Sequence, residues 1–198
     1  MKLYLTVIGV AVTLISAINI FFQTAEWYYV IIAVVFSAVM QFALDGTLAI
    51  IINKMPDAWF DVDNRLYHVS EWEKRLYKKL NVRGWKDNVW ELGGLGGFSK
   101  SKLLDPRNPD YIEKFVIECN KGVLTHRLSY PIGFLVMLTL KGITPFTIAI
   151  PVATVNVFLN ILPTLALRYN TPKLTAILNR LRRNAAKRKA EQSTAISE

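Results

Sequence analysis

The chain has 198 residues, 52% of them hydrophobic, and a formal net charge of +9. A single cysteine, Cys119, excludes an internal disulfide framework. Nucleic-acid-binding proteins carry such a charge on a soluble domain with a recognisable motif; this sequence has no such motif, so nucleic acid is not an expected partner.

Long apolar runs begin near the N-terminus. Residues 3–22 carry no charge, and residues 28–53 are interrupted only by Gln41 and Asp45. A third apolar region, residues 129–167, is broken near residues 141–145 and therefore counts as two segments. Because a bilayer core needs ~20 apolar residues per helix, the pattern predicts an all-α integral membrane protein with four transmembrane helices. The first run lacks a clear cleavage site and is interpreted as a retained helix.

Basic residues fall mainly into two regions, residues 54–127 and 168–189. Lysine and arginine accumulate on the cytoplasmic side of membrane proteins, so both regions are expected there. The chain is then a multi-pass protein of the cell membrane with both termini in the cytoplasm, and membrane lipids are its first expected partners.

The polar region after the second run has amphipathic character. Ser70 and Glu73 form a capping-box pattern that predicts a helix over residues 70–80. Trp72 and Tyr77 share its apolar face, which predicts an interfacial helix with both aromatic rings toward lipid. The glycine-rich stretch "ELGGLGGFSKSK" (residues 91–102) lacks the spacing of a phosphate-binding loop and is interpreted as a flexible re-entrant or interfacial loop.

These patterns predict four parts. Residues 1–54 form a transmembrane hairpin, and residues 55–110 form a cytoplasmic or interfacial segment with amphipathic helices. Residues 111–179 form a helix that leads into a second transmembrane hairpin. Residues 180–198 form a basic tail that begins as an amphipathic helix and ends without regular structure.

Polar residues inside the apolar runs are candidates for function. Asp45 is an acid within a predicted span; it is either functional or packed against a polar neighbour, and the sequence leaves both open. Asn156 and Asn160 are four residues apart, so they share one helix face and either bind a neighbouring helix or line a cavity.

Glu118 and His126 precede the third apolar run, at the expected membrane boundary. Histidine titrates near neutral pH, which makes His126 a candidate general base. Eight helical residues separate it from Glu118 by ~12 Å, too far for a hydrogen bond, so the two can flank a ligand across Gly122. The candidates for a residue that orients His126 are Tyr130, Asp45, Asn160 and Tyr169. His68 is interpreted as structural, and the sequence contains no zinc-site or serine-hydrolase motif.

Three stretches carry a resemblance to a known family: "LNVRGWKDNVWELGG", "IEKFVIECNKGVLTHR" and "NILPTLALRYNTPKL". In order and spacing they resemble the staphyloxanthin-type carotenoid acyltransferases (the glycosyl-diaponeurosporenoate acyltransferase family). That family has V-x-x-W-K, then I-I-E-T…E-L-x-H-W, then N-x-P…Q-R-Y-N-R-x-R-L. The resemblance covers residues 81–174.

The resemblance implies that Glu118 and His126 are catalytic. The residues it implies for substrate binding are Trp85, Lys86, Arg127, Arg168, Tyr169 and Asn170, and Asn160 joins them from the helix-face argument. Lys86, Arg127, Arg168 and Lys173 form a basic set suited to a phosphate. The chain departs from the family at Val123, Arg127 and Leu167, and Pro163 is shifted by one. Val123 stands where the family has a second glutamate, which leaves Glu118 as the only carboxylate near His126 on that helix.

The implied activity is transfer of a fatty acyl chain to a hydroxyl of a membrane-bound glycolipid or glycosylated carotenoid. It needs no metal or resident cofactor; an acyl carrier such as acyl-CoA would be the donor substrate. The alternative is a non-catalytic protein, either a lipid-binding scaffold or a partner subunit of a membrane enzyme complex. If Glu118, His126 and the residues 168–170 converge on one cavity open to the bilayer, the interpretation as an enzyme is favoured.

Overall fold

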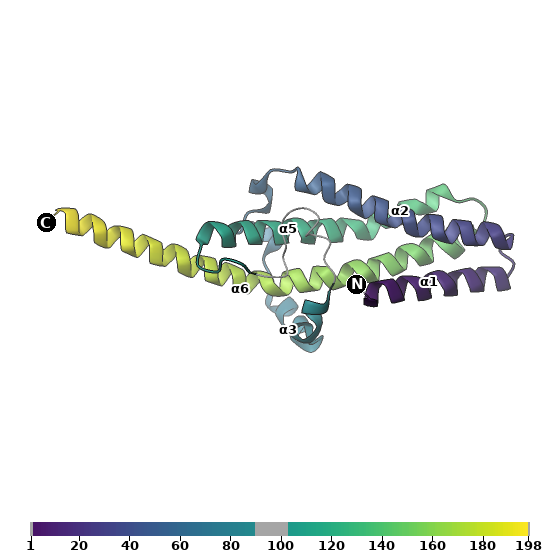
Figure 1. Ribbon diagram of the computed structural model, residues 1–198, viewed down its shortest axis with the longest axis horizontal. Helices are drawn as coiled ribbons and strands as arrows, with labels where there is room; N and C mark the ends of the chain where they lie inside the picture. The colour runs from purple at the N-terminus through teal and green to yellow at the C-terminus, as the bar shows by residue number, and fades with distance from the viewer. Residues whose placement is uncertain (1, 90–102, 198) are drawn as a thin grey trace. The chain divides into compact units, whose positions relative to one another are not determined.

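The computed structural model describes residues 2–89 and 103–197, without the side chains of residues 189 and 193–197, and this part of the chain is helical and contains no strand (Figure 1). The α-helices are α1 (Lys2–Phe21), α2 (Trp27–Asn53), α3 (Glu71–Lys79), α4 (Val82–Trp85), α5 (Pro109–Ile132) and α6 (Ile150–Ser197). Shorter turns are the 3₁₀ helices η1 (Asp57–Phe60), η2 (Arg65–Tyr67), η3 (Lys86–Asn88) and η5 (Gly133–Thr139), and the π-helical η6 (Pro145–Ala149). The prediction of an all-α fold is confirmed.

Three helical segments of the described chain are long and apolar enough to cross a membrane, judged by length and composition. They are α1, α2 and the segment Pro145–Gln192, which joins η6 to most of α6. Segments of this length and composition are those expected of a membrane protein. The run predicted over residues 129–140 forms the end of α5 and then η5; the backbone tightens to 3₁₀ geometry just after Pro131, which lacks a donor N–H. A count of four spans therefore stays a prediction.

The chain divides into two compact units. The bundle unit comprises Met1–Met55, Asn88–Trp90 and Gly122–Thr164. The amphipathic unit comprises Pro56–Asp87, Glu91–Lys121 and Leu165–Glu198. The helices α5 and α6 each contribute residues to both units.

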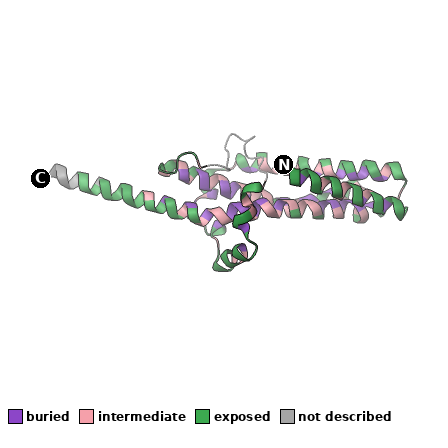
Figure 2. Ribbon diagram, turned by 60° about the horizontal axis from the view of Figure 1, so that its bottom comes forward, coloured by how far each residue is buried: buried purple, intermediate pink, exposed green. Residues whose placement is uncertain are grey.

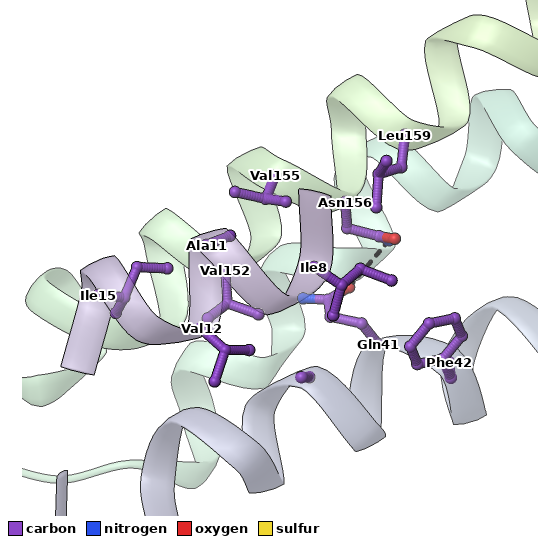
Figure 3. Close-up of a pocket in the computed structure, with 11 residues that line it drawn as sticks. Ile8, Ala11, Val12, Ile15, Gln41, Phe42, Val152, Val155, Asn156 and Leu159 are labelled. Atoms are coloured by element: carbon purple, nitrogen blue, oxygen red, sulfur yellow. Dashed lines mark hydrogen bonds between the residues drawn. The ribbon is translucent and has the colours of Figure 1, made fainter. Parts of the chain in front are cut away.

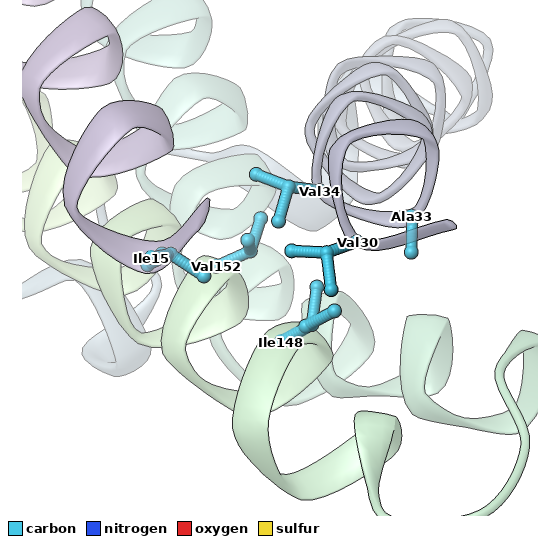
Figure 4. Packing of buried hydrophobic residues seen from close by; sticks show 6 residues of the cluster. All are labelled: Ile15, Val30, Ala33, Val34, Ile148 and Val152. Carbon is cyan, nitrogen blue, oxygen red and sulfur yellow. The ribbon is translucent and has the colours of Figure 1, made fainter. Parts of the chain in front are cut away.

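In the bundle unit, α1 and α2 form the predicted antiparallel hairpin and lie side by side in Figure 1. Figure 4 shows its apolar core, where Ile15 of α1 and Val30 of α2 meet Val152 of α6. Asn19 donates a hydrogen bond to the carbonyl of Thr147 at 2.9 Å, which ties α1 to η6. Most other apolar side chains of α1 point outward; Figure 2 shows exposed positions along the helix that begins at the N-terminus. Such exposure suits contact with lipid rather than water.

In the amphipathic unit, α3 begins as its capping box predicts. The Ser70 hydroxyl accepts a hydrogen bond from the Glu73 amide, and the Glu73 carboxylate accepts one from the Ser70 amide. Trp72 is 63% exposed, but Tyr77 is buried against Tyr169 of α6. The prediction that Tyr77 faces lipid was wrong, because its ring packs against Tyr169 of α6, whereas Trp72 on the same helix stays exposed.

Two other expectations concern the C-terminal end of the chain and the glycine-rich stretch. The backbone of α6 is helical as far as Ser197, where the sequence predicted an irregular end. Alanine, lysine, arginine and glutamate, which dominate this region, all have high helix propensity. The loop interpretation of residues 91–102 falls outside the described residues.

Candidate functional site

The bundle unit brings His126 of α5 and Asn160 of α6 together. The distance between His126 Nδ1 and Asn160 Oδ1 is 2.7 Å, that of a short hydrogen bond. His126 is partly buried, and Asn160 is 6% exposed. Of the four residues considered as orienting partners for His126, the structure therefore assigns Asn160.

The remaining contacts of Asn160 decide which imidazole nitrogen carries the proton. Its amide nitrogen donates to Asp45 Oδ2 at 3.1 Å and to the Asn156 carbonyl at 3.0 Å. The NH₂ group is therefore turned toward acceptors, and the amide oxygen is the atom that faces His126. An oxygen can only accept, so His126 Nδ1 is protonated and the basic lone pair of the neutral ring is on Nε2.

Gln41, Asp45 and Asn156 extend this contact. Together with Asn160 they form what we call the polar row. Asn156 donates to Gln41 Oε1 at 3.1 Å and lies 3.5 Å from Asp45 Oδ1. Gln41 in turn donates to the Gly133 carbonyl at 2.7 Å. A Cβ at Gly133 would lie 2.6 Å from Gln41 Oε1, so any larger residue there would displace the Gln41 amide. The row thus joins α2, α6 and η5 by hydrogen bonds that end at His126.

A small apolar cleft, with an enclosed volume of about 40 Å³, borders the polar row (Figure 3). Its walls come from α1, α2 and α6, and all but two of its lining residues are apolar. The two exceptions are Gln41 and Asn156, which face each other across one end and are joined by the hydrogen bond drawn in Figure 3. A cleft that is mostly apolar with a few placed polar groups is the usual form of a small-molecule site.

Tyr130 and Thr164 form a separate contact one turn beyond His126 and Asn160. The Tyr130 hydroxyl donates to Thr164 Oγ1 at 2.9 Å, and Thr164 donates to the Asn160 carbonyl at 2.8 Å. Tyr130 is thus engaged elsewhere than at the imidazole, and its bond with Thr164 is a second tie between α5 and α6.

Glu118 belongs to the amphipathic unit, where it lies 3.4 Å from Lys121 Nζ on the next turn of α5. Lys121 also binds Asp57 at 2.5 Å. Burial opposes the charge of Lys121, but the hydrogen bond and the charges of Asp57 and Glu118 prevail and raise its pKa. In the structure Glu118 therefore takes part in an ion-pair cluster, and two turns of α5 separate it from His126.

Arg168, expected to bind substrate, is buried in an ion pair with Glu73. Its Nε and Nη2 donate to the two carboxylate oxygens at 2.8 and 2.7 Å, and Nη2 also donates to the His68 carbonyl at 3.0 Å. Burial opposes ionisation of Glu73, but the hydrogen bonds from Arg168 and Ser70 outweigh it and lower the pKa of Glu73 to about 2. The pair fixes α3 to α6, which is a structural role.

The other residues implied by the resemblance have these positions. Tyr169 packs edge-on against Tyr77, and Lys173 Nζ lies 4.4 Å from the centre of the Tyr169 ring. Lys86 pairs with its neighbour Asp87, and the Trp85 indole donates to the Leu80 carbonyl at 3.0 Å. These contacts all lie in the amphipathic unit. Asn170 of the same unit is partly buried, and Arg127 is exposed in the bundle unit.

Sequence reasoning noted Asp45 and the pair Asn156 and Asn160 but did not join Asp45 to that pair, and it gave Gln41 and Glu73 no site role. The available signal was spacing: Gln41 and Asp45 are four residues apart in one predicted span, as are Asn156 and Asn160 in another. Two polar pairs of equal spacing on two apolar helices suggest facing stripes that hydrogen-bond across the helix interface.

Comparison with known proteins identifies a family for this chain. The family model described as glycosyl-4,4'-diaponeurosporenoate acyltransferase matches residues 63–180, more than half of the chain. The matched region contains His126 and Asn160, whereas Gln41 and Asp45 precede it. No curated protein and no solved structure matches the chain. The match shows that the chain belongs to the glycosyl-4,4'-diaponeurosporenoate acyltransferase family.

Proposed function

We propose that this protein is a membrane acyltransferase that esterifies a hydroxyl of a membrane-bound glycolipid or glycosylated carotenoid with a fatty acyl chain. The family match supports the reaction class. The observation that carries the proposal is the contact between His126 and Asn160, since it leaves the imidazole in the tautomer that a general base needs.

In the proposed reaction, His126 Nε2 takes the proton of the acceptor hydroxyl while its oxygen attacks the acyl carbonyl carbon. The new carbon–oxygen bond gives a tetrahedral intermediate, which collapses as the bond to the carrier sulfur breaks. The imidazolium then returns its proton to the leaving thiolate. During the step the positive charge on His126 is stabilised by Asn160 Oδ1 and, behind it, by the Asp45 carboxylate.

The donor in this proposal is an acyl carrier such as acyl-CoA. Arg127 and Lys173 are exposed cations suited to its phosphates, while Arg168 holds α3 in place and contributes indirectly. Trp85, Lys86, Tyr169 and Asn170 remain proposed contacts to the substrates, and Glu118 is proposed to position them. We place the enzyme in the cell membrane with four spans and both termini in the cytoplasm, because the basic residues follow the positive-inside pattern.

Two experiments test the proposal. Lipid and pigment profiling of cells with and without the protein should reveal an acyl ester that depends on it. With purified protein, His126→Ala should lower turnover by about 10²- to 10⁴-fold, the usual contribution of a general base, and His126→Gln should do no better. Glu118→Gln should have a smaller effect.

The control is His68→Ala, since His68 is exposed and contacts Arg168 through its backbone carbonyl. This variant should keep near wild-type turnover. A His126→Ala protein that is folded and turns over normally would refute the catalytic assignment. If the wild-type protein forms no ester with any acceptor but binds lipid, the scaffold alternative is correct.

A further inference from the structure

The apolar cleft has the features of a ligand site that opens to the surface of the bundle unit. Ile8, Ala11 and Ile15 of α1 form one wall and Phe42 of α2 another, and Phe42 is 51% exposed. In a membrane protein, such an opening gives hydrocarbon chains direct access from the bilayer. Its enclosed volume is only about 40 Å³, so it can hold part of a hydrocarbon chain while the rest lies in the opening.

The polar row separates this cleft from His126, and that separation indicates which substrate enters. Gln41 and Asn156 border the cleft, and Asn160 lies one helical turn, about 6 Å, beyond Asn156. The acyl chain of a donor has only methylene groups next to its reacting carbonyl, so that chain would lie unfavourably along polar side chains. A glycosylated lipid has hydroxyl groups between its reacting oxygen and its apolar tail. The reacting oxygen would lie at His126, the other hydroxyl groups along the polar row, and the tail at the cleft.

Asp45 adds hydrogen-bonding capacity to the row. Within the described residues its carboxylate accepts hydrogen bonds from Asn156 and Asn160 alone, both neutral amides. A carboxylate has about four acceptor positions, so it can also accept from hydroxyl groups of a ligand. Asp45 is partly buried, and a carboxylate in an apolar span is costly unless such donors reach it.

We propose that the cleft and the polar row form the acceptor subsite, in which part of the hydrocarbon tail of a glycosylated lipid occupies the cleft and its sugar lies along Gln41, Asp45 and Asn156. This inference rests on the proposed function for the reacting hydroxyl at His126. The binding itself does not require catalysis, so it can be tested without turnover.

The test uses the purified full-length chain in nanodiscs and a dodecyl glucoside with a diazirine at the end of its chain. After irradiation, mass spectrometry should locate the label on α1 and α2. Ala11→Phe fills the cleft and should reduce labelling about tenfold, because it displaces roughly two methylene groups. The matched control is Ala17→Phe, which places the same ring at an exposed position of α1 and should label normally.

A second pair of variants guards against misfolding of Ala11→Phe. Phe42→Ala widens the cleft and should extend labelling to longer-chain glucosides, whereas Phe36→Ala, exposed on the same helix, should not. His126→Ala should label like the wild type; turnover by that variant would refute the proposed mechanism and leave the subsite intact. Equal labelling of Ala11→Phe and Ala17→Phe, or stronger labelling of the same residues by a diazirine fatty acid, would overturn the acceptor assignment.

Discussion

Replacing Asn160 by leucine isolates the contact on which the proposed chemistry depends. Leucine has the same branching at Cγ but no polar atom, so the change removes the acceptor for His126 Nδ1–H at 2.7 Å and the donor to Asp45 at 3.1 Å. The histidine itself remains. The variant therefore asks whether His126 acts alone or only when Asn160 holds its tautomer and ring orientation.

The expected effects on stability and on rate have different sizes. Leaving a buried partner without its hydrogen bond costs about 1–3 kcal/mol, so the free energy of unfolding should fall by about 2 kcal/mol. Turnover should fall further, by about 10²- to 10³-fold, because Nε2 is then protonated in part of the population and the ring is no longer fixed. The loss should stay below that of His126→Ala, which removes the base entirely.

The assay measures acyl transfer by purified protein in nanodiscs, together with thermal unfolding of each variant. Thr164→Val is the matched control: it breaks the 2.9 Å bond from Tyr130, also between α5 and α6, and the bond to the Asn160 backbone carbonyl, but it leaves the Asn160 side chain and His126 in place. It should lose comparable stability and retain turnover within about threefold, the loss expected of a purely structural hydrogen bond. If Asn160→Leu also retains turnover within that limit, His126 does not depend on Asn160, and the proposed role of Asn160 is refuted.

Three further predictions concern the amphipathic unit and the topology. Because the folded pKa of Glu73 is lowered from 4.5 to about 2, its ion pair with Arg168 stabilises the protein above pH ~4.5 and loses that contribution as the pH falls through about 2. At ~1.4 kcal/mol per pKa unit this amounts to about 3 kcal/mol, and Glu73→Gln should abolish that pH dependence in chemical unfolding. Should the variant unfold with the same acid midpoint as the wild type, the pair does not contribute as described. Trp72, 63% exposed, should be quenched by brominated phosphatidylcholine, and an unquenched Trp72 would exclude an interfacial α3. Cysteines at Gln23 and Lys141 should both react with an impermeant thiol reagent from outside the cell; protection of either would require a different topology.

Some features of this protein follow from the sequence because they depend on neighbouring residues. The capping box that starts α3 needs only Ser70 and Glu73, three positions apart, and it forms as predicted. The long apolar runs similarly predict helices α1 and α2, since an unbroken hydrophobic stretch in a bilayer must satisfy its backbone internally. The family segments around His126 could also be found from residue order alone, and the family match confirms them.

The tertiary structure decided which polar residues meet. The sequence offered four partners for His126 and two interpretations of Asp45, because spacing along a helix defines a face but not the helix that packs against it. Packing of α2, α5 and α6 selected Asn160 and joined Asp45 to it, while Tyr130 bonded to Thr164 instead. The same cause explains Arg168, whose charge indicated a phosphate ligand until the fold placed Glu73 beside it. A partner supplied by a helix distant in the sequence depends on how whole helices pack, and no local pattern records that arrangement.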